Sequence, residues 1–141
     1  MRFENWISPT IIEGEPTKYQ WVVKNVENFS LGYKTDIGAF TYINARHGVI
    51  IEDFVQVGSH CSIYSLSTID NKEGEIRLKN RCRIGTHSAI MPGVTIGAGS
   101  IIGAFSFVNK DIPDNVLAYG VPAKVIRKLT TAEIEKMQDQ E

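Results

Sequence analysis

The chain has 141 residues, the size of one ordinary domain, which predicts one folding unit with small terminal additions rather than two domains. Its formal net charge is -1, from 15 Lys and Arg against 16 Asp and Glu, so no overall charge attracts nucleic acid or an anionic membrane. No apolar run is long enough to cross a bilayer and residues 1–10 do not resemble a secretory signal, which predicts a cytoplasmic protein without a membrane partner. The two cysteines, Cys61 and Cys82, form no CxxC motif and are predicted to be small buried side chains.

Residues 1–30 show no repeat and contain Trp6, Tyr19 and Trp21. We expect this segment to be an irregular cap over the open end of a repeat fold, because an uncovered terminal coil exposes unpaired backbone groups.

From Leu31 onward, an aliphatic residue recurs with a period that is mostly six. The series is Leu31, Ile37, Ile43, Ile51, Val57, Ile63, Ile69, Leu78, Ile84, Ile90, Ile96, Ile102 and Val108. Glycine often follows the aliphatic residue, as after Ile37, Val57, Ile84, Ile96 and Ile102. A small or branched residue lies four positions further on, at Thr41, Val55, Cys61, Ser67, Cys82, Ser88, Val94, Ser100 and Ser106.

This period fits neither an amphipathic helix nor a half-buried strand, but it fits short strands separated by tight corners. If three hexads make one turn, each aliphatic residue lies on its counterpart in the next turn at the spacing of about 4.8 Å between paired strands. Glycine then serves corners that need a positive φ or a close backbone approach. An antiparallel sandwich predicts no such constant spacing. The pattern therefore predicts an all-β fold, a parallel β-helix shaped as a triangular prism over residues 31–112.

The repeat is interrupted twice, around Arg46-His47-Gly48 and within residues 70–75, and such breaks are usually loops on the working face. After Val108 the pattern ends. Residues 113–141 are predicted to form a C-terminal extension with a short α-helix over residues 129–137, because Thr130 and Glu133 have the spacing of a capping box.

Four segments carry a family resemblance: residues 84–97, residues 102–104, residues 108–113, and residues 120–127, the last of which reads GVPAKVIR. Together they resemble the hexapeptide-repeat acyltransferases, in particular the galactoside and maltose acetyltransferase branch and sugar N-acetyltransferases. The resemblance implies a left-handed β-helix, against the usual right-handed crossover. It also implies a homotrimer with active sites between subunits, acetyl-coenzyme A as co-substrate, a small sugar acceptor and no metal.

The same resemblance assigns six cofactor-binding residues. Thr86 and Ala104 match corner positions that hold the pantetheine arm, Asn109 and Lys110 match a contact pair beyond the last coil, and Lys124 and Arg127 match a basic pair near the phosphates. Ammonium and guanidinium groups are suitable phosphate partners. The alternative is that Lys124, Arg127 and Lys128 form a solvated basic end of the chain.

On the acceptor side, Asn44 resembles the family's asparagine near the reacting carbonyl, where an amide can donate to a developing oxyanion. Glu52 matches a substrate-contacting acid, and Asp70 and Asn71 are predicted either to contact the acceptor or to form a turn. The family's catalytic histidine belongs to a loop that corresponds to the region after Ile69, and here that loop has none. Because a neutral amine needs a weaker base than a hydroxyl does, this departure favours an amino-sugar acceptor.

The histidines of the chain are the remaining candidates for the base. His60 and His87 have the same hexad offset, so we expect them to form a column beside Thr86 and Ala104. His60 lies one coil nearer the N-terminus, and His47 lies at the first break of the repeat. His60 and His47 are therefore the candidate catalytic bases. The alternative for each is a corner side chain exposed to solvent or packed between subunits.

Taken together, the residues and the resemblance predict transfer of an acetyl group to a sugar or nucleotide-linked amino sugar destined for a surface polysaccharide, with N-acetylation favoured. One alternative is a trimeric zinc enzyme of the carbonic anhydrase type, although no two histidines have the spacing of a local ligand pair. Another is a non-catalytic β-helix scaffold, which leaves Lys110, Lys124 and Arg127 without a role.

Overall fold

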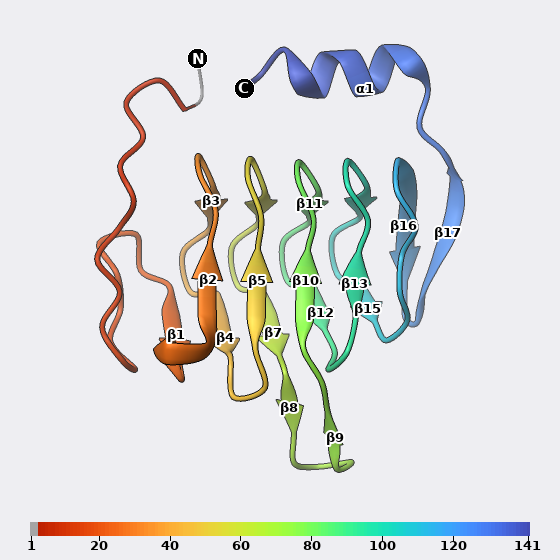
Figure 1. The fold of residues 1–141 in the computed structure, drawn as a ribbon. Coiled ribbons are helices and arrows are strands. Elements are labelled where there is room, and N and C mark those ends of the chain that lie inside the picture. The colour runs from red at the N-terminus through yellow and green to blue at the C-terminus, as the bar shows by residue number, and fades with distance from the viewer. Residues whose placement is uncertain (1–2) are drawn as a thin grey trace.

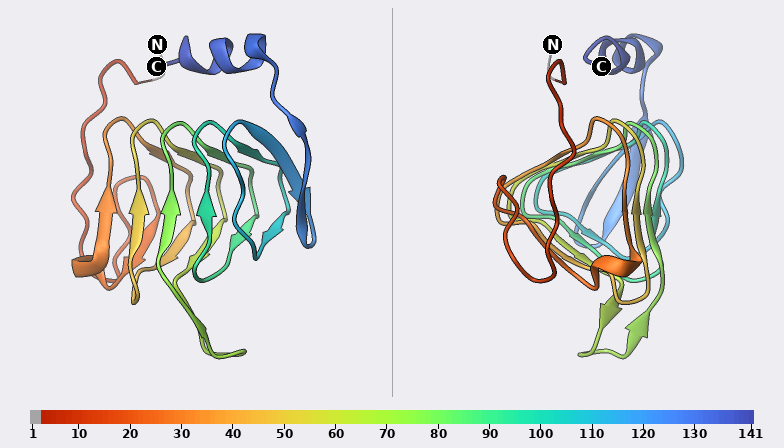
Figure 2. Two further views of the ribbon diagram at one scale, coloured as in Figure 1. Left: turned by 45° about the vertical axis from the view of Figure 1, so that its right-hand side comes forward. Right: turned by 60° about the vertical axis from the view of Figure 1, so that its left-hand side comes forward.

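A computed structural model describes residues 3–141 and confirms the left-handed parallel β-helix (Figure 1). Three sheets form the sides of a triangular prism, and one turn of the chain around it is a coil (Figure 2). Sheet 1 contains β1 (Val22–Lys24), β4 (Tyr42–Asn44), β7 (Ser62–Tyr64), β12 (Ala89–Ile90) and β15 (Phe107–Val108). Sheet 2 contains β2 (Phe29–Leu31), β5 (Val49–Ile51), β10 (Ile76–Leu78) and β13 (Thr95–Ile96).

Sheet 3 contains β3 (Asp36–Ile37), β6 (Gln56–Val57), β11 (Arg83–Ile84), β14 (Ile101–Ile102), β16 (Val116–Gly120) and β17 (Ala123–Lys128). A hairpin of β8 (Leu66–Ser67) and β9 (Lys72–Glu73) projects away from the prism (Figure 1). A 3-10 turn covers Val26–Asn28, and the C-terminal helix α1 covers Thr131–Gln138. The turns from sheet 1 to sheet 2, from sheet 2 to sheet 3 and from sheet 3 to sheet 1 are the first, second and third corners.

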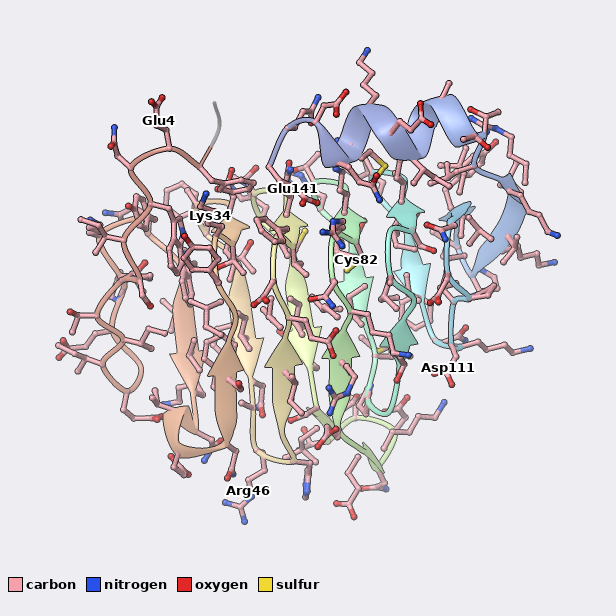
Figure 3. All side chains as sticks on the ribbon, turned by 45° about the horizontal axis from the view of Figure 1, so that its top comes forward. Glu4, Lys34, Arg46, Cys82, Asp111 and Glu141 are labelled. Carbon is pink, nitrogen blue, oxygen red and sulfur yellow. The ribbon has the colours of Figure 1, made fainter. Side chains whose placement is uncertain are left out.

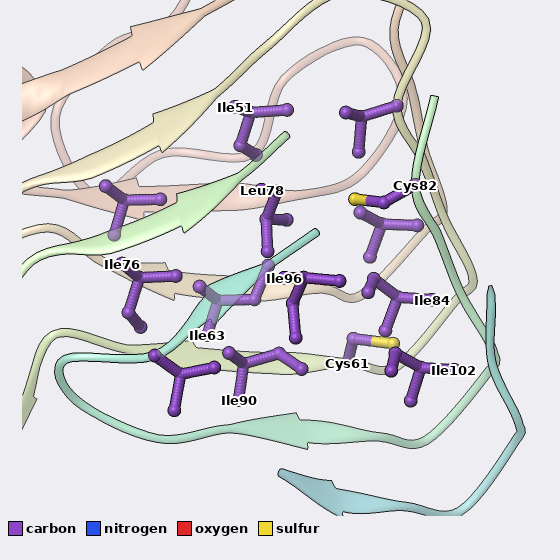
Figure 4. Close-up of a cluster of buried hydrophobic side chains, with 14 of the residues drawn as sticks. Ile51, Cys61, Ile63, Ile76, Leu78, Cys82, Ile84, Ile90, Ile96 and Ile102 are labelled. Carbon is purple, nitrogen blue, oxygen red and sulfur yellow. The ribbon is translucent and has the colours of Figure 1, made fainter. Parts of the chain in front are cut away.

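The core is the predicted stack of aliphatic side chains inside the prism (Figure 4). In sheet 1, for example, Ile43 pairs with Ile63 and Ile63 with Ile90, and all three are fully buried. Cys61 and Cys82 are buried inside the same prism, as predicted, and burial raises the pKa of both thiols. The identical side chains pack on one another because the parallel ladders keep equivalent residues in register.

The predicted register was wrong at the second break. Ile69 was assigned to the stack, but it is 97% exposed in the turn of the β8–β9 hairpin. Ser67 is likewise in the hairpin, and the inner position predicted for it is taken by the fully buried Ile76, which pairs with Val49 of the preceding coil. The insertion is therefore longer than predicted, because Ile69 lies six residues after Ile63 by sequence but outside the coil.

The glycines that directly follow an aliphatic residue serve close approach rather than a positive φ, whereas Gly48, Gly93 and Gly99 have φ of 98, 83 and 69°. A Cβ on Gly58 would lie 2.6 Å from the backbone nitrogen of Thr86, and one on Gly85 would lie 2.4 Å from that of Ala104. The left-handed conformation at the third corner is instead adopted by residues with rings: Phe40, His60, His87 and Phe105, with φ between 58 and 65°.

Both ends of the prism are covered. The parallel sheets begin at Val22, inside the segment predicted as a cap, and the buried Trp21 lies just before this first strand. At the other end, β16 pairs in parallel with β14 and then in antiparallel fashion with β17, so the last coil continues beyond residue 112. The capping box of Thr130 and Glu133 is confirmed at the start of α1. In residues 3–141, no helix is long and apolar enough to span a membrane.

Two isoleucines test this register. Ile63→Ala should lower the free energy of unfolding by about 2–5 kcal/mol, because it leaves a cavity in the stack. Ile69→Ala, the matched control on the hairpin, should change it by less than about 0.5 kcal/mol. Denaturant unfolding of both variants measures the difference, and equal losses would contradict the register.

Candidate functional site

The first corner brings together two of the predicted catalytic residues. Asn44 ends β4 and His47 follows it in the corner, while Ser65 comes directly after β7, the neighbouring strand. The buried Ser65 hydroxyl donates to the Asn44 carbonyl at 2.8 Å and accepts from the His47 backbone N–H at 2.9 Å. A single buried hydroxyl therefore fixes the backbone of both residues.

The side chain of Asn44 has a defined orientation. Its Oδ1 accepts a hydrogen bond from the backbone N–H of Arg46 at 3.0 Å. Since the carbonyl oxygen of the amide is used in this turn, the Nδ2 amino group is the part that can donate to a bound molecule. This is the polarity that the predicted role beside a developing oxyanion requires.

His47 pairs with a carboxylate from the hairpin. Its Nε2 lies 3.2 Å from Oε2 of Glu73 on β9, and the two side chains are 34% and 67% exposed. When Nε2–H donates to this carboxylate, Nδ1 is the nitrogen that accepts a proton. The pair has the arrangement of a general base with an orienting acid. Sequence reasoning missed Glu73, although its place at the base of an insertion next to this corner was the available signal.

An open depression of about 530 Å³ adjoins His47. It lies between the first corner and sheet 2, and its lining is Glu27, Asn28, Phe29, Ser30, Arg46, His47, Gly48, Ile50 and Glu75. The lining contains both acidic and basic side chains beside the candidate base.

The three predicted acceptor contacts are not gathered at this corner. Glu52 lies at the other end of β5, where it pairs with Arg77 at 2.8 Å and accepts from the backbone N–H of Asn80 at 3.1 Å. Asp70 and Asn71 lie in the turn of the hairpin, where Asp70 approaches Lys72 at 3.8 Å and Asn71 has φ of 54°. Their positions match the turn-forming alternative at least as well as acceptor contact.

The third corner contains the predicted column. The rings of His60 and His87 stack with centroids 4.7 Å apart, and His87 stacks on Phe105 at 4.9 Å. Phe40 covers the outer face of His60 at 5.1 Å. His60 therefore lies between two rings on an exposed ridge, and among residues 3–141 it contacts no carboxylate of the kind that His47 has.

Thr86 belongs to the same corner and orients His87. Its hydroxyl donates to the Ser59 carbonyl at 2.8 Å, so the 2.9 Å contact with His87 Nδ1 has the imidazole as donor. Ala104 occupies the equivalent exposed position one coil later, where the Phe105 N–H donates to the Thr86 carbonyl. Thr86 and Ala104 thus lie on the same corner of successive coils, along which a long flexible ligand can lie.

The remaining cofactor candidates are divided between corners. Lys124 on β17 pairs with Tyr119 on β16, and Tyr119 packs against Gly103 of the third corner. Asn109 and Lys110 are exposed at the end of β15, at the edge of sheet 1 that faces the first corner. Lys124 alone therefore extends the corner of Thr86 and Ala104.

Arg127 is engaged within the chain. Its guanidinium makes two hydrogen bonds to the Glu133 carboxylate, at 2.7 and 2.9 Å. The hydrogen bond from Arg127 and the capping interaction with Thr130 lower the pKa of Glu133 to about 2, and the carboxylate raises the pKa of Arg127. A phosphate at Arg127 has to compete with this bidentate pair.

Neither corner has the geometry of a zinc site. Within residues 3–141, no three His, Cys, Asp or Glu side chains come together as metal ligands, and His60 and His87 lie face to face rather than converging on one point. Within these residues, a single chain therefore brings together no zinc ligand set of its own.

Comparison with known proteins agrees with this architecture. Residues 75–110 match the family described as bacterial transferase hexapeptide (six repeats). Galactoside O-acetyltransferase of Escherichia coli K12 is 39% identical over 116 residues, which cover 72% of this chain and 57% of that protein. The chain thus spans less than three fifths of the length of this curated relative.

Solved structures give the same result. A putative acetyltransferase of Bacillus cereus is 30% identical, with a TM-score of 0.62 over 85% of this chain and 77% of that one. A hexapeptide-repeat acetyltransferase of Vibrio cholerae, solved with acetyl-coenzyme A, is 28% identical, with a TM-score of 0.74 over 78% of this chain and 65% of that one. The chain belongs to the hexapeptide-repeat transferase family.

The role of Ser65 in this site can be tested by stability. Ser65→Ala should lower the free energy of unfolding by about 1–3 kcal/mol, because the His47 N–H loses its acceptor in a buried position. The matched control is Ser62→Ala on the outward side of β7, expected within about 0.5 kcal/mol of the native chain. Urea denaturation distinguishes them. An unchanged free energy of unfolding in Ser65→Ala would contradict the role of this hydroxyl in fixing Asn44 and His47.

The Arg127–Glu133 pair predicts a pH dependence. Because the pKa of Glu133 is lower in the folded chain than its ordinary value of 4.5, the pair stabilises the start of α1 above that pH and is lost as the pH falls toward about 2. NMR titration of the Glu133 carboxyl should show this low pKa, and Arg127→Ala should raise it toward the ordinary value. A pKa of 4.5 for the Glu133 carboxyl in the native chain would contradict the predicted ion pair.

Proposed function

We propose that this chain is an acetyl-coenzyme A-dependent acetyltransferase that acts on a sugar-type acceptor, with the amine of a nucleotide-linked amino sugar favoured over a hydroxyl. The single observation that carries the proposal is the His47–Glu73 pair beside Asn44 in a chain of this family. The relatives named above as acetyltransferases support the reaction class, and the acetyl-coenzyme A complex supports the donor.

In this reaction, bound acetyl-coenzyme A supplies the acetyl group as a thioester. His47 accepts at Nδ1 the proton that the acceptor nitrogen loses as it forms a bond to the carbonyl carbon. Asn44 donates from Nδ2 to the carbonyl oxygen as charge develops on it. Glu73 keeps Nε2 protonated and stabilises the imidazolium, which returns its proton to the departing sulfur. An amine suits this partly exposed base, because a neutral amine needs less activation than a hydroxyl does.

We also propose a homotrimer with the reaction between subunits. In one chain, Asn44 and Thr86 lie at opposite ends of the strands of sheet 1. The candidate base and the third corner therefore do not share one cleft. A neighbouring subunit that places its third corner against this first corner brings the two halves together. Thr86, Ala104 and Lys124 then hold the cofactor, with Asn109, Lys110 and Arg127 as further contacts.

The activity is tested by thiol release from acetyl-coenzyme A in the presence of nucleotide-linked amino sugars, free amino sugars and simple galactosides. We expect turnover with an amino-sugar class. Binding of coenzyme A is measured separately by calorimetry. Absence of both binding and turnover would overturn the proposal, and turnover of galactosides alone would overturn the preference for an amine.

The base assignment has its own test. His47→Ala should lower kcat by about 100-fold and leave the Kd of coenzyme A unchanged, because the proton acceptor is lost but the third corner is intact. Glu73→Gln should lower kcat less, since its amide still accepts a hydrogen bond from Nε2. His60→Ala tests the competing base, and Lys18→Ala, on the N-terminal segment, is the control. A larger loss in His60→Ala than in His47→Ala would assign the base to the third corner.

A further inference from the structure

The side chain of Arg46 is exposed to solvent beside the candidate base. Its backbone is held on both sides, because its N–H donates to Asn44 Oδ1 at 3.0 Å and its carbonyl accepts from Asn28 Nδ2 at 3.1 Å. The side chain lines the depression next to His47 and points away from the prism (Figure 3). A well-fixed backbone thus presents a cation at the edge of this depression.

Arg46 differs from the other arginines in residues 3–141. Arg77 pairs with Glu52, Arg81 with Glu141, Arg127 with Glu133, and Arg83 donates to Gln140. Over the same range, the guanidinium of Arg46 alone has no side-chain partner. A guanidinium presents planar paired donors that match two oxygens of a phosphate. An unpaired guanidinium beside the candidate base is available to bind an anion.

The depression also contains acidic groups. Glu27 and Glu75 line it together with Arg46. The Oε1 atom of Glu75 lies 3.8 Å from the guanidinium of Arg77. A ligand with only negative charge is repelled by these carboxylates, and a neutral galactoside uses neither sign of charge. A ligand that carries both a phosphate and an amino group can satisfy both.

We propose that the depression is the acceptor subsite and that Arg46 binds the phosphate of a nucleotide-linked amino sugar, with Glu27 and Glu75 facing its amine end near His47. This inference rests on the proposed acetyl transfer and names the group by which the acceptor is selected. Arg46 is then the residue that distinguishes a nucleotide-linked acceptor from the free sugar.

The test compares two acceptors that differ only in the phosphate-bearing part. Arg46→Ala should lower kcat/KM about 10- to 100-fold for the nucleotide-linked amino sugar and far less for the free amino sugar, because only the former loses a charge-assisted hydrogen bond. Arg46→Lys should recover part of the loss. Lys18→Ala removes one positive charge elsewhere on the chain and should change neither value.

Calorimetry gives a readout that does not depend on turnover. The Kd of a nucleoside diphosphate should rise about tenfold or more in Arg46→Ala, while that of coenzyme A stays unchanged. A parallel rise for coenzyme A would assign Arg46 to the cofactor's phosphates, and equal losses on both acceptors would show a structural role. Each result overturns the inference but leaves the acetyl transfer intact, whereas a wild-type chain that turns over neither acceptor overturns both.

Discussion

The close stacking of each coil on the next is the constraint on which the rest of the structure depends. At the third corner, successive backbones approach so closely that a methyl group at Gly58 or Gly85 would overlap the following coil. Equivalent residues must therefore lie directly above one another, which selects aliphatic side chains inside and small ones at the inner corner positions. Extra residues have no room within the stack and must leave it at a corner.

The position of the candidate site follows from this constraint. The longest insertion leaves the prism after β7 and returns at β10. The part of the hairpin that joins the prism therefore lies over the first corner of the preceding coil. That return places Glu73 against His47 and lets the buried Ser65 bind both strands of the corner. The third corner has no insertion and stays a continuous ridge. In the proposed trimer, the two kinds of corner thus have different functions.

The coils could be predicted from the sequence because stacking imposes the same local chemistry every six residues, and for the same reason equal offsets predicted the His60–His87 column. The hairpin register could not, since Ile69 and Ser67 have the right residue types at the right spacing but are outside the stack. Glu73 was missed because its partner is in the previous coil. The antiparallel pairing of β16 with β17 was also not predicted, because no repeat in the sequence encodes it.

A base on the coil has a physical consequence that a base on a loop lacks. The backbone of His47 is fixed by the buried Ser65 hydroxyl, whereas Glu73 belongs to a projecting hairpin and is two-thirds exposed. An exposed ion pair adds little stability, so in the proposed mechanism Glu73 orients the imidazole rather than holding the hairpin. Rigid placement of the proton acceptor and solvent access to its partner suit an acceptor that arrives charged and must be deprotonated before it reacts. The charged lining around Arg46 and the proposed amine acceptor thus depend on the same corner.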